Sequence, residues 1–535
     1  MLRFINKILN INFCYSIFLF ILLCGGSIFL NSYSVNDPQI VPKWLFTGMG
    51  IGVFLLFISL KQFGPKTWQR KKPNLHILYA SILFLCWVQA LYGILQALKL
   101  CTPGITYTVT GSFDNPAGFA TCLCAGLPLA FPFLKSRRKG IRWFTYVVIC
   151  TLITAVCLCQ SRTGVLSILT VAGCILYPYL PPIKYKKVYI ILLLISLLTG
   201  VYFLKKDSAD GRLLIWKCTW QMIKEHPLTG WGKGAFTAHY MDYQAAYFRT
   251  HPQSRFTLLA DNVNHPFNEY LNVFLTNGFP ALICVVVIGA FLYNCYRKKP
   301  SWKGKAAGLS LLSIGILSLF SYPFSYPFTW IIVVLNGYVL IRQARFHIKI
   351  SQKKRKIGAI CITILSIYLL YNVTQRTLAE REWKRISDLS LAGQIKEMLP
   401  QYKQLTAKLG NNPFFLYNYA AELYMIERYN DCLPLLKACR NHWADYDLEM
   451  LFGETYFQLK QYEKAAEHYK TATEMCPVKF IPLYKLYLVR KEQGENEKAH
   501  TLALQIINKK VKVPSFEINR IKAKMKIDLN KQIKQ

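Results

Sequence analysis

Acidic residues are few in this sequence, and they are unevenly distributed. The 535 residues include 27 Asp and Glu against 65 Lys and Arg, and only eight of the acids precede residue 373. Those eight all fall outside the centres of the long apolar runs: Asp37, Asp114, Asp207, Asp210, Glu225, Asp242, Asp261 and Glu269. An ion-coupled transporter usually keeps a carboxylate relay at mid-depth in the membrane. The sequence therefore argues against that class.

Spacings typical of metal sites are missing as well. The four histidines between residues 205 and 267 are not arranged as HxH or HxxxH. Two CxC pairs fall on expected helices, where that spacing points the thiols to different faces and makes a poor chelate. Most of the 17 cysteines lie in apolar runs, where a thiol packs as a small hydrophobe. We therefore predict no metal, no other cofactor and no disulfide framework.

Hydrophobic residues, by contrast, are abundant. They make up 53% of the chain, and the mean hydropathy of +0.23 is too high for an ordinary soluble protein. The formal net charge of +38 would suggest nucleic-acid binding in a soluble protein. Here the basic residues are clustered in short loops between apolar runs, which is typical of the cytoplasmic loops of membrane proteins. We predict a membrane protein that binds membrane lipids and no nucleic acid.

Eleven apolar runs are long enough to cross a bilayer as helices, which takes about 20 residues. The first lacks a clear signal-peptide cleavage site, so we count it as a span. The predicted spans are residues 12–30, 44–60, 75–98, 116–134, 143–160, 163–180, 187–204, 268–295, 306–322, 327–343 and 356–372. The predicted fold class is all-α: a polytopic membrane helix bundle over residues 1–372, followed by a soluble helical repeat domain over residues 380–535.

The charges of alternate loops predict the orientation of the chain. One set of loops is basic and contains no Asp or Glu, so it is expected in the cytoplasm: residues 61–72, 135–142, 184–187, 297–305 and 342–356. The opposite set includes a large polar loop at 205–267. Eleven spans from an inside N-terminus place this loop and everything after residue 372 on the extracytoplasmic side of the membrane.

The C-terminal part of the sequence has a period near 34 residues. Its clearest unit, residues 446–477, has Gly, Ala, Tyr and Pro at tetratricopeptide positions, and weaker copies precede and follow it. Such helical repeats usually bind partners and rarely perform chemistry. We predict a tetratricopeptide-like domain with a possible protein partner, and the alternative is a helical bundle without repeats.

Two short patterns lie at predicted outer ends of spans. GSFDNPAGFA, residues 111–120, contains Asn115 at the start of a span, where its side chain either caps the helix or presents its amide to a ligand. SRTG, residues 161–164, contains Arg162 as the sole charge of a tight turn. An arginine there either reaches toward lipid phosphates or binds a phosphate or diphosphate of a substrate with its planar fork.

Two longer patterns begin and end the large polar loop. GRLLIWKCTWQMIKEHPLTGWGKGAF, residues 211–236, predicts an amphipathic helix carrying Arg212, followed by a turn in which Gly230 and Gly232 let the backbone approach a ligand. NHPFNEYLNVFLTNGFP, residues 264–280, places three polar residues before a late span: His265, Asn268 and Glu269. The histidine is either a hydrogen-bonded structural residue or a base that accepts a proton from a hydroxyl.

In this order, the four patterns resemble those of the O-antigen ligase and O-antigen polymerase superfamily of bacterial envelope glycosyltransferases, over about residues 100–345. The resemblance implies a large periplasmic loop and a glycan donor on an undecaprenyl diphosphate carrier, used without a metal. It also implies catalytic roles for Arg162, Arg212 and His265. Substrate-binding residues are expected at Asn115, Gly230, Gly232, Asn268 and Glu269. Ala117 departs from the family's NPN-like segment, which leaves any role of a second asparagine open.

The resemblance leaves the acceptor undecided. A ligase uses lipid A core, a polymerase uses another glycan repeat, and an oligosaccharyltransferase uses a protein hydroxyl. The repeat domain favours the first or the third type, because it could hold an acceptor or an assembly partner. Two alternatives belong to other classes, namely a transporter or flippase of lipid-linked sugars and a membrane-anchored scaffold.

Overall fold

The structure is a computed structural model that describes residues 17–63, 74–102, 107–179, 206–344 and 351–533, with a few single positions between 181 and 203. It divides into two compact units. The bundle unit comprises Met1–Lys184, Phe267–Glu269 and Cys284–Arg385. The loop unit comprises Tyr185–Pro266, Tyr270–Ile283 and Ile386–Gln535. Every element in the described part of the chain is a helix, which confirms the predicted all-α class.

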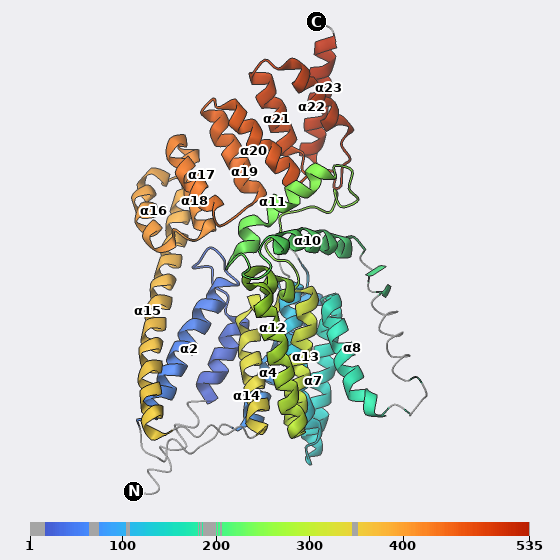
Figure 1. Cartoon of the computed structure of the whole chain (residues 1–535), viewed down its shortest axis with the longest axis vertical. Helices are drawn as coiled ribbons and strands as arrows, with labels where there is room; N and C mark the ends of the chain where they lie inside the picture. Colours follow the sequence, from blue (N-terminus) through green and yellow to red (C-terminus); the bar gives the residue numbers. More distant parts are fainter. Residues whose placement is uncertain are drawn as a thin grey trace. The chain divides into compact units, whose positions relative to one another are not determined.

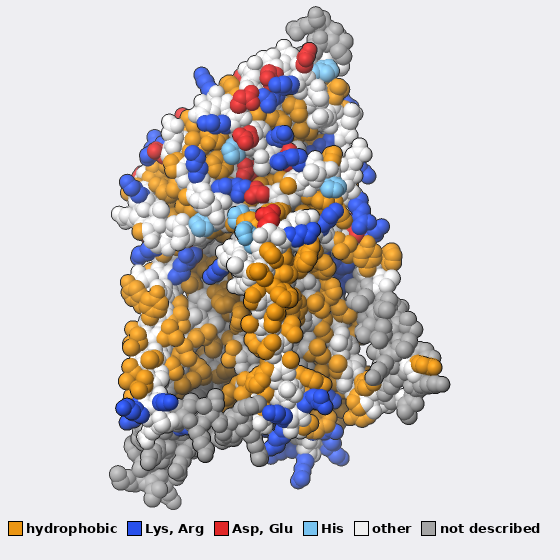
Figure 2. Space-filling model, in the orientation of Figure 1, with side chains coloured by type: hydrophobic (Ala, Val, Ile, Leu, Met, Phe, Trp, Pro, Cys, Tyr) orange, Lys and Arg blue, Asp and Glu red, His pale blue; other side chains and the backbone are white. Residues whose placement is uncertain are grey.

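The bundle unit contains the long apolar helices (Figure 1). Their bounds are α2 Val41–Lys61, α4 Leu75–Ala97, α5 Pro116–Gly126, η1 Leu127–Ala130, α6 Phe131–Leu134, α7 Lys139–Leu158, α8 Arg162–Leu176, η2 Tyr177–Tyr179, α13 Trp302–Phe320, η3 Pro323–Ser325, α14 Pro327–Gln343 and α15 Gln352–Leu391. Helix α12, Glu269–Lys298, is shared between the two units. Figure 2 shows hydrophobic side chains over the sides of these helices, as expected of a surface that faces lipid.

Among the described residues, seven helices are long and apolar enough to cross a membrane: Val41–Lys61, Leu75–Ala97, Pro116–Leu134, Lys139–Leu158, Glu269–Lys298, Trp302–Phe320 and Gln352–Leu391. They correspond to seven of the eleven predicted spans. Three other predicted spans form shorter helices, Ile17–Phe29, α8 and α14. The remaining predicted span, 187–204, lies almost wholly outside the described residues.

Two of the seven spans are less regular than the apolar pattern suggested. Residues 116–134 form α5, a 3-10 turn and α6, because Pro128 and Pro132 each remove a helical hydrogen bond. Helix α12 is interrupted at Gly278, which has a φ of 75° and is followed by Pro280. A hydropathy window detects neither irregularity, since both depend on single residues.

Serine hydroxyls tie the central helices of the bundle together. Ser310 on α13 donates to the carbonyl of Ala125 (2.6 Å), and Ser313 donates to that of Cys124 (2.9 Å). Ser313 also bonds Ser167 of α8 at 2.6 Å. In lipid such bonds between helices replace the hydrophobic drive that water would supply. They fix α5, α8 and α13 side by side, which sets the positions of the residues at the ends of these helices.

Basic side chains gather at the end of the bundle where α6 meets α7 and α12 leads into α13 (Figure 2). The turns at this end contain several Lys and Arg and no Asp or Glu. The opposite end carries Asp114 and Glu269. This polarity matches the pattern used above to predict the orientation, while the side of the membrane itself stays a prediction.

The loop unit contains α10 Lys206–Glu225, α11 Ala235–Thr250 and a series of short helices. The series is α16 Ile395–Leu409, α17 Pro413–Met425, α18 Tyr429–Arg440, α19 Tyr446–Gln458, α20 Tyr462–Met475, α21 Ile481–Glu492, α22 Asn496–Asn508 and α23 Phe516–Ile533. Consecutive members pack against each other in pairs. Gly453 allows one close approach, because a Cβ there would lie 2.5 Å from the ring of Tyr469. The tetratricopeptide assignment stays a prediction.

The boundaries of the two units differ from the domains predicted from the sequence. Helix α15 continues without a break from Gln352 to Leu391, through the predicted linker at 372–380. The division falls after Arg385, inside this helix. The large polar loop, 205–267, groups with the C-terminal helices, whereas the sequence grouped it with the membrane bundle.

Candidate active site

Asn115 begins helix α5 in the bundle unit. Its side-chain oxygen accepts the backbone N–H groups of Ala117 (2.8 Å) and Gly118 (3.0 Å), so the predicted capping role is confirmed. Its amide nitrogen donates to the hydroxyls of Tyr322 (2.7 Å) and Tyr326 (2.9 Å). The same nitrogen lies 2.7 Å from a carboxylate oxygen of the neighbouring Asp114.

Asp114, Tyr322 and Tyr326 complete a polar cluster that the sequence patterns did not single out. Tyr326 donates its hydroxyl to Asp114 at 2.8 Å. Burial raises the pKa of both Tyr322 and Tyr326, so their hydroxyls stay protonated and can serve as donors. The tyrosines lie in the turn between two predicted spans, where their repeated SYPF context at residues 321–328 is the sole local signal.

Glu269 joins this cluster from the start of α12. Its side chain is buried, and one carboxylate oxygen accepts the backbone N–H of Phe324 at 3.1 Å. The ring of Phe267 lies edge-on to Tyr322, with the centroids 5.4 Å apart. Asn268, between these two residues, is half-buried. The bundle unit therefore brings Asn115 and Glu269 to the same turn.

Arg162 is the first residue of α8, at the same end of the bundle as Asn115. Ser161 caps the helix by accepting the N–H of Gly164 (3.3 Å). A Cβ on Gly164 would lie 3.0 Å from that of Ala120 on α5. Ala120 is five residues after Asn115, about 7.5 Å along the helix axis at the usual rise. The half-buried Arg162 therefore lies near the level at which α5 begins.

In the loop unit, Trp216 links the helix that carries Arg212 to the segment that carries His265. Arg212 and Trp216 are one turn apart on α10, and the Trp216 indole N–H donates to the carbonyl of Pro266 at 2.9 Å. Pro266 directly follows His265. Burial lowers the pKa of His265 to about 4, so the imidazole is neutral at neutral pH and can accept a proton.

Gly230 and Gly232 form a turn that crosses the start of α12. The N–H groups of Trp231 and Gly232 donate to the carbonyls of Leu275 (2.8 Å) and Thr276 (2.9 Å). Gly230 has a φ of 69°, and a Cβ there would lie 2.5 Å from the backbone of Thr276. The backbone of this turn therefore approaches the backbone of α12 closely, as the missing side chains allow. An approach to a ligand stays a prediction.

The sequence of the chain was compared with known protein families. Residues 117–286 match the family described as O-antigen ligase. The chain contains an O-antigen ligase domain. The match begins two residues after Asn115 and includes the other predicted site residues: Arg162, Arg212, Gly230, Gly232, His265, Asn268 and Glu269. No curated protein matches the chain.

This O-antigen ligase domain indicates the general activity, which is that of a membrane glycosyltransferase of the O-antigen ligase or polymerase type. Its substrates are accordingly a lipid-linked glycan and an acceptor. In the described part of the chain, no three His, Cys, Asp or Glu side chains are grouped so that they could hold a metal ion. Independence from metal remains a prediction.

Aromatic rings surround the glycine turn of this O-antigen ligase domain. Trp231 lies between two histidines, with His226 edge-on at 4.5 Å and His239 at 4.8 Å between ring centroids. The Trp231 indole N–H donates to the carbonyl of Met222 on α10 at 2.8 Å. Burial lowers the pKa of His239. The turn is thus held by α10 on one side and by α11 on the other.

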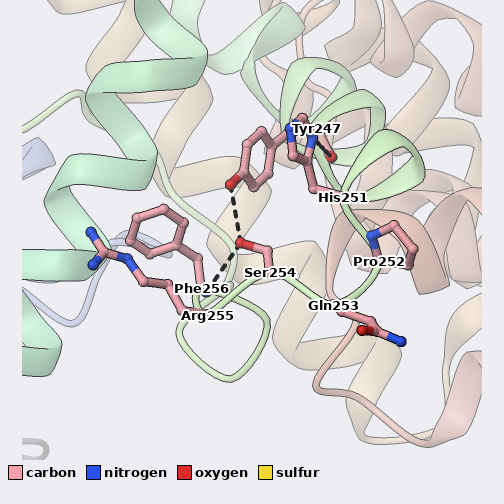
Figure 3. A pocket seen from close by; sticks show the side chains of 7 residues that line it. All are labelled: Tyr247, His251, Pro252, Gln253, Ser254, Arg255 and Phe256. Carbon is pink, nitrogen blue, oxygen red and sulfur yellow. Dashed lines mark hydrogen bonds between the residues drawn. The ribbon is translucent and has the colours of Figure 1, made fainter.

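A pocket of about 590 Å³ lies beyond the end of α11 (Figure 3). Tyr247 stacks on His251 there and bonds Ser254 at 3.0 Å, while the guanidinium of Arg255 lies over the ring of Phe256. None of the predicted site residues lines this pocket. The chemistry expected of an O-antigen ligase therefore has to be sought at the two clusters described above, one in each unit.

Proposed function

We propose that the protein transfers a glycan from an undecaprenyl-diphosphate-linked donor to an acceptor at the periplasmic face of a bacterial inner membrane. The reaction is of the O-antigen ligase or protein O-oligosaccharyltransferase type. The family match over the segment that contains Arg162, Arg212 and His265 carries this proposal. The hydrogen bond from Trp216, one helical turn from Arg212, to the carbonyl of Pro266, which follows His265, supports it.

In the proposed reaction, the bond between the anomeric carbon and the carrier diphosphate breaks, and the diphosphate leaves with the electron pair. An acceptor hydroxyl oxygen forms the new glycosidic bond. Negative charge accumulates on the departing diphosphate, which Arg162 and Arg212 would stabilise. A guanidinium suits this role because its planar fork matches two phosphate oxygens at once.

His265 would accept the proton of the acceptor hydroxyl. Its lowered pKa keeps the imidazole neutral before the substrate binds. The negative diphosphate would raise this pKa in the complex, because a nearby opposite charge favours the imidazolium. The proton affinity of His265 would therefore increase when the donor is in place. A positioned base of this kind contributes about 10²- to 10⁴-fold to a rate.

The remaining predicted residues would shape the substrate site. Asn115 fixes the start of α5 and the two tyrosine hydroxyls, and Glu269 fixes the turn after α13. His265 and Glu269 are four residues apart, so the backbone limits the separation of their Cα atoms to about 14 Å. Asn268 lies between them, and the turn at Gly230 and Gly232 would lie near the donor.

The acceptor is best identified in a deletion strain that is complemented with the wild-type gene. A ligase deletion leaves lipid A core without the distal glycan, whereas a polymerase deletion leaves single repeats on the core. An oligosaccharyltransferase deletion leaves an envelope protein unglycosylated. Loss of glycan from lipid A core or from an envelope protein supports the proposed reaction type and names its acceptor, whereas single repeats on the core would identify a polymerase instead. An unchanged glycan profile in all three fractions contradicts the proposal.

A further inference from the structure

The C-terminal helices of the loop unit hold helix α11. Figure 1 shows α11 beside α19 and α20, and α11 packs against α20. The backbone of the two segments is joined directly, because the N–H of Ala444 donates to the carbonyl of Thr237 at 2.8 Å. Helix α11 also packs against α10, which carries Arg212. One helix thus touches both the C-terminal series and the helix with a predicted catalytic residue.

Arg440, the last residue of α18, makes the most extensive of these contacts. Its guanidinium pairs with Asp242 of α11, bonds Glu449 of α19 at 2.9 Å, and lies 3.4 Å from the carbonyl of Ala238. The second oxygen of Glu449 lies 2.6 Å from Nδ1 of His468 on α20. Three C-terminal helices and α11 therefore meet at one network.

The network continues from α11 to the glycine turn. Asp242 and His239 are three residues apart on α11, so their side chains lie on the same helix face. The ring of His239 lies 4.8 Å from that of Trp231, which stands between Gly230 and Gly232. Arg440 is therefore connected to the glycine turn through Asp242, His239 and Trp231.

A second junction reaches the segment before His265. Gln244 of α11 is fully buried, and its amide donates to the carbonyls of Met475 (2.7 Å) and Asp261 (3.2 Å). Asn262 donates to the carboxylate of Asp445 at 3.2 Å and accepts the N–H of Tyr446 at 3.2 Å. Asn262 is three residues before His265, so this junction limits where the imidazole can lie.

Separating α11 from the C-terminal helices would be costly. The side chains of Arg440 and Asp242 are 27% and 38% exposed, and removing one partner of such a pair leaves a partly buried charge. The buried amide of Gln244 would lose the carbonyl of Met475 as an acceptor. These contacts are made within one chain. The surface of the C-terminal helices that holds α11 is therefore already occupied.

We propose that residues 386–535 act as an intramolecular brace that sets the geometry of the loop carrying Arg212, the glycine turn and His265, with Arg440 as a positioning residue. This inference rests on the proposed function for its catalytic consequence. Its structural consequence is independent of that function, since it concerns the order of α11 and the turn alone.

Hydrogen–deuterium exchange of the full-length protein in detergent tests the brace. We expect Arg440→Ala to speed exchange in α11 and at residues 228–234 by about tenfold or more, because a charged hydrogen-bond network is lost. Exchange in α21 and α22 should stay unchanged. Asp242→Asn, which keeps the shape of the side chain, should affect the same segments if Arg440→Ala fails to fold.

Arg428→Ala is the matched control. Arg428 directly precedes the same helix α18 and pairs with Asp431 at 2.6 Å, but both side chains are more than half exposed. Its loss should change exchange in neither segment, because exposed pairs contribute little. Unchanged exchange of α11 in both Arg440→Ala and Asp242→Asn would overturn the brace.

Transfer kinetics separate a positioning role from mere stability. Arg440→Ala should lower kcat by up to about 10²-fold, since a small displacement of catalytic groups has effects of this size. KM for the donor should change less, and Arg440→Lys should recover part of the rate by restoring the charge next to Asp242. An unchanged kcat in Arg440→Ala overturns the positioning role. A wild-type protein without transfer activity contradicts the proposed function, while the exchange result still decides the brace.

Discussion

His265 shows how its surroundings prepare a residue for its proposed role. The imidazole precedes Pro266, whose carbonyl is held by Trp216. Burial in this position disfavours the charged form and lowers the pKa from 6.5 to about 4. The neutral ring is the form that can take a proton from an acceptor hydroxyl. In the proposed reaction Arg212, one helical turn from Trp216, would supply positive charge to the diphosphate.

This pKa makes a prediction about the pH dependence of transfer. The value of kcat/KM, which reports the free enzyme, should stay level between pH 8 and 6 and fall only toward about pH 4. Between about pH 4 and 6.5, His265 binds fewer protons in the folded protein than in the unfolded chain. The contribution of neutral His265 to the free energy of unfolding is therefore complete above about pH 6.5 and is lost as the pH falls through about 4. An acid limb at pH 6 to 7 that disappears in His265→Gln would contradict the burial argument.

Among single residues, the sequence could predict those whose role is evident from neighbouring residues. Asn115 before Pro116 is a recognisable helix cap, and the structure confirms it. The hydrogen bonds from Asn115 to Tyr322 and Tyr326 could not be predicted. They join residues more than 200 positions apart, and only the packing of α5 against the turn after α13 brings them together.

At the scale of elements, the crossing of the glycine turn with α12 gives a second prediction. Gly278 has a φ of 75°, and a Cβ there would lie 2.0 Å from the carbonyl oxygen of Leu228. We expect Gly278→Ala to cost at least about 2 kcal/mol, through strain and a backbone clash. Thermal unfolding in detergent measures this loss.

Gly232→Ala serves as the control for that substitution. Gly232 also has a positive φ of 91°, but nothing lies within 4 Å of its added Cβ. The cost should be limited to the backbone conformation, about 1 kcal/mol. Equal losses in the two variants would show that the crossing of Gly278 with Leu228 does not constrain the loop.

Asp445 makes a third prediction, at the junction between helix α19 and the loop. Burial raises the pKa of its carboxyl from 3.8 to about 7. The folded protein then binds more protons than the unfolded chain between these values, so stability should decrease as the pH rises through about 7. Asp445→Asn keeps the helix cap and removes the titration. The fall in Tm between pH 5 and 8 should therefore be smaller in the variant, and an identical fall would contradict the prediction.

Apolar periodicity predicted most of the long helices and failed where a single residue or a distant contact decides. It placed a span at 268–295, but it did not predict the interruption of α12 at Gly278. It ended a span at residue 372, whereas α15 continues to Leu391. The polar second half of α15 is a regular helix without an apolar run, so hydropathy alone marks no continuation there.

At the scale of the whole molecule, the predicted orientation can be measured directly. Alkaline phosphatase fused after residue 535 should be active, and a green fluorescent protein at the same position should be dark, because each folds on one side of the bacterial inner membrane only. The same pair of reporters inserted in the basic turn at 135–138 should give the opposite result. Active phosphatase at both positions would contradict the predicted number of crossings.

The sequence predicted a membrane bundle and a C-terminal helical domain, and the structure describes a helical unit for each. It could not predict that the large loop belongs with the C-terminal helices. That grouping depends on contacts such as Gln244 with Met475 and Arg440 with Asp242, about 200 residues apart. Neither pair has a local signature, since each residue taken alone is an ordinary helix position.

The most direct test is glycan transfer by purified protein in liposomes, with an undecaprenyl-diphosphate-linked glycan and the acceptor that the deletion strain identifies. We predict that Arg162→Ala, Arg212→Ala and His265→Ala each reduce kcat by about 10²-fold or more while the protein stays folded. Arg255→Ala, in the pocket that contains no predicted site residue, should transfer at the wild-type rate. Full transfer by the His265→Ala or Arg212→Ala protein would contradict the proposed mechanism.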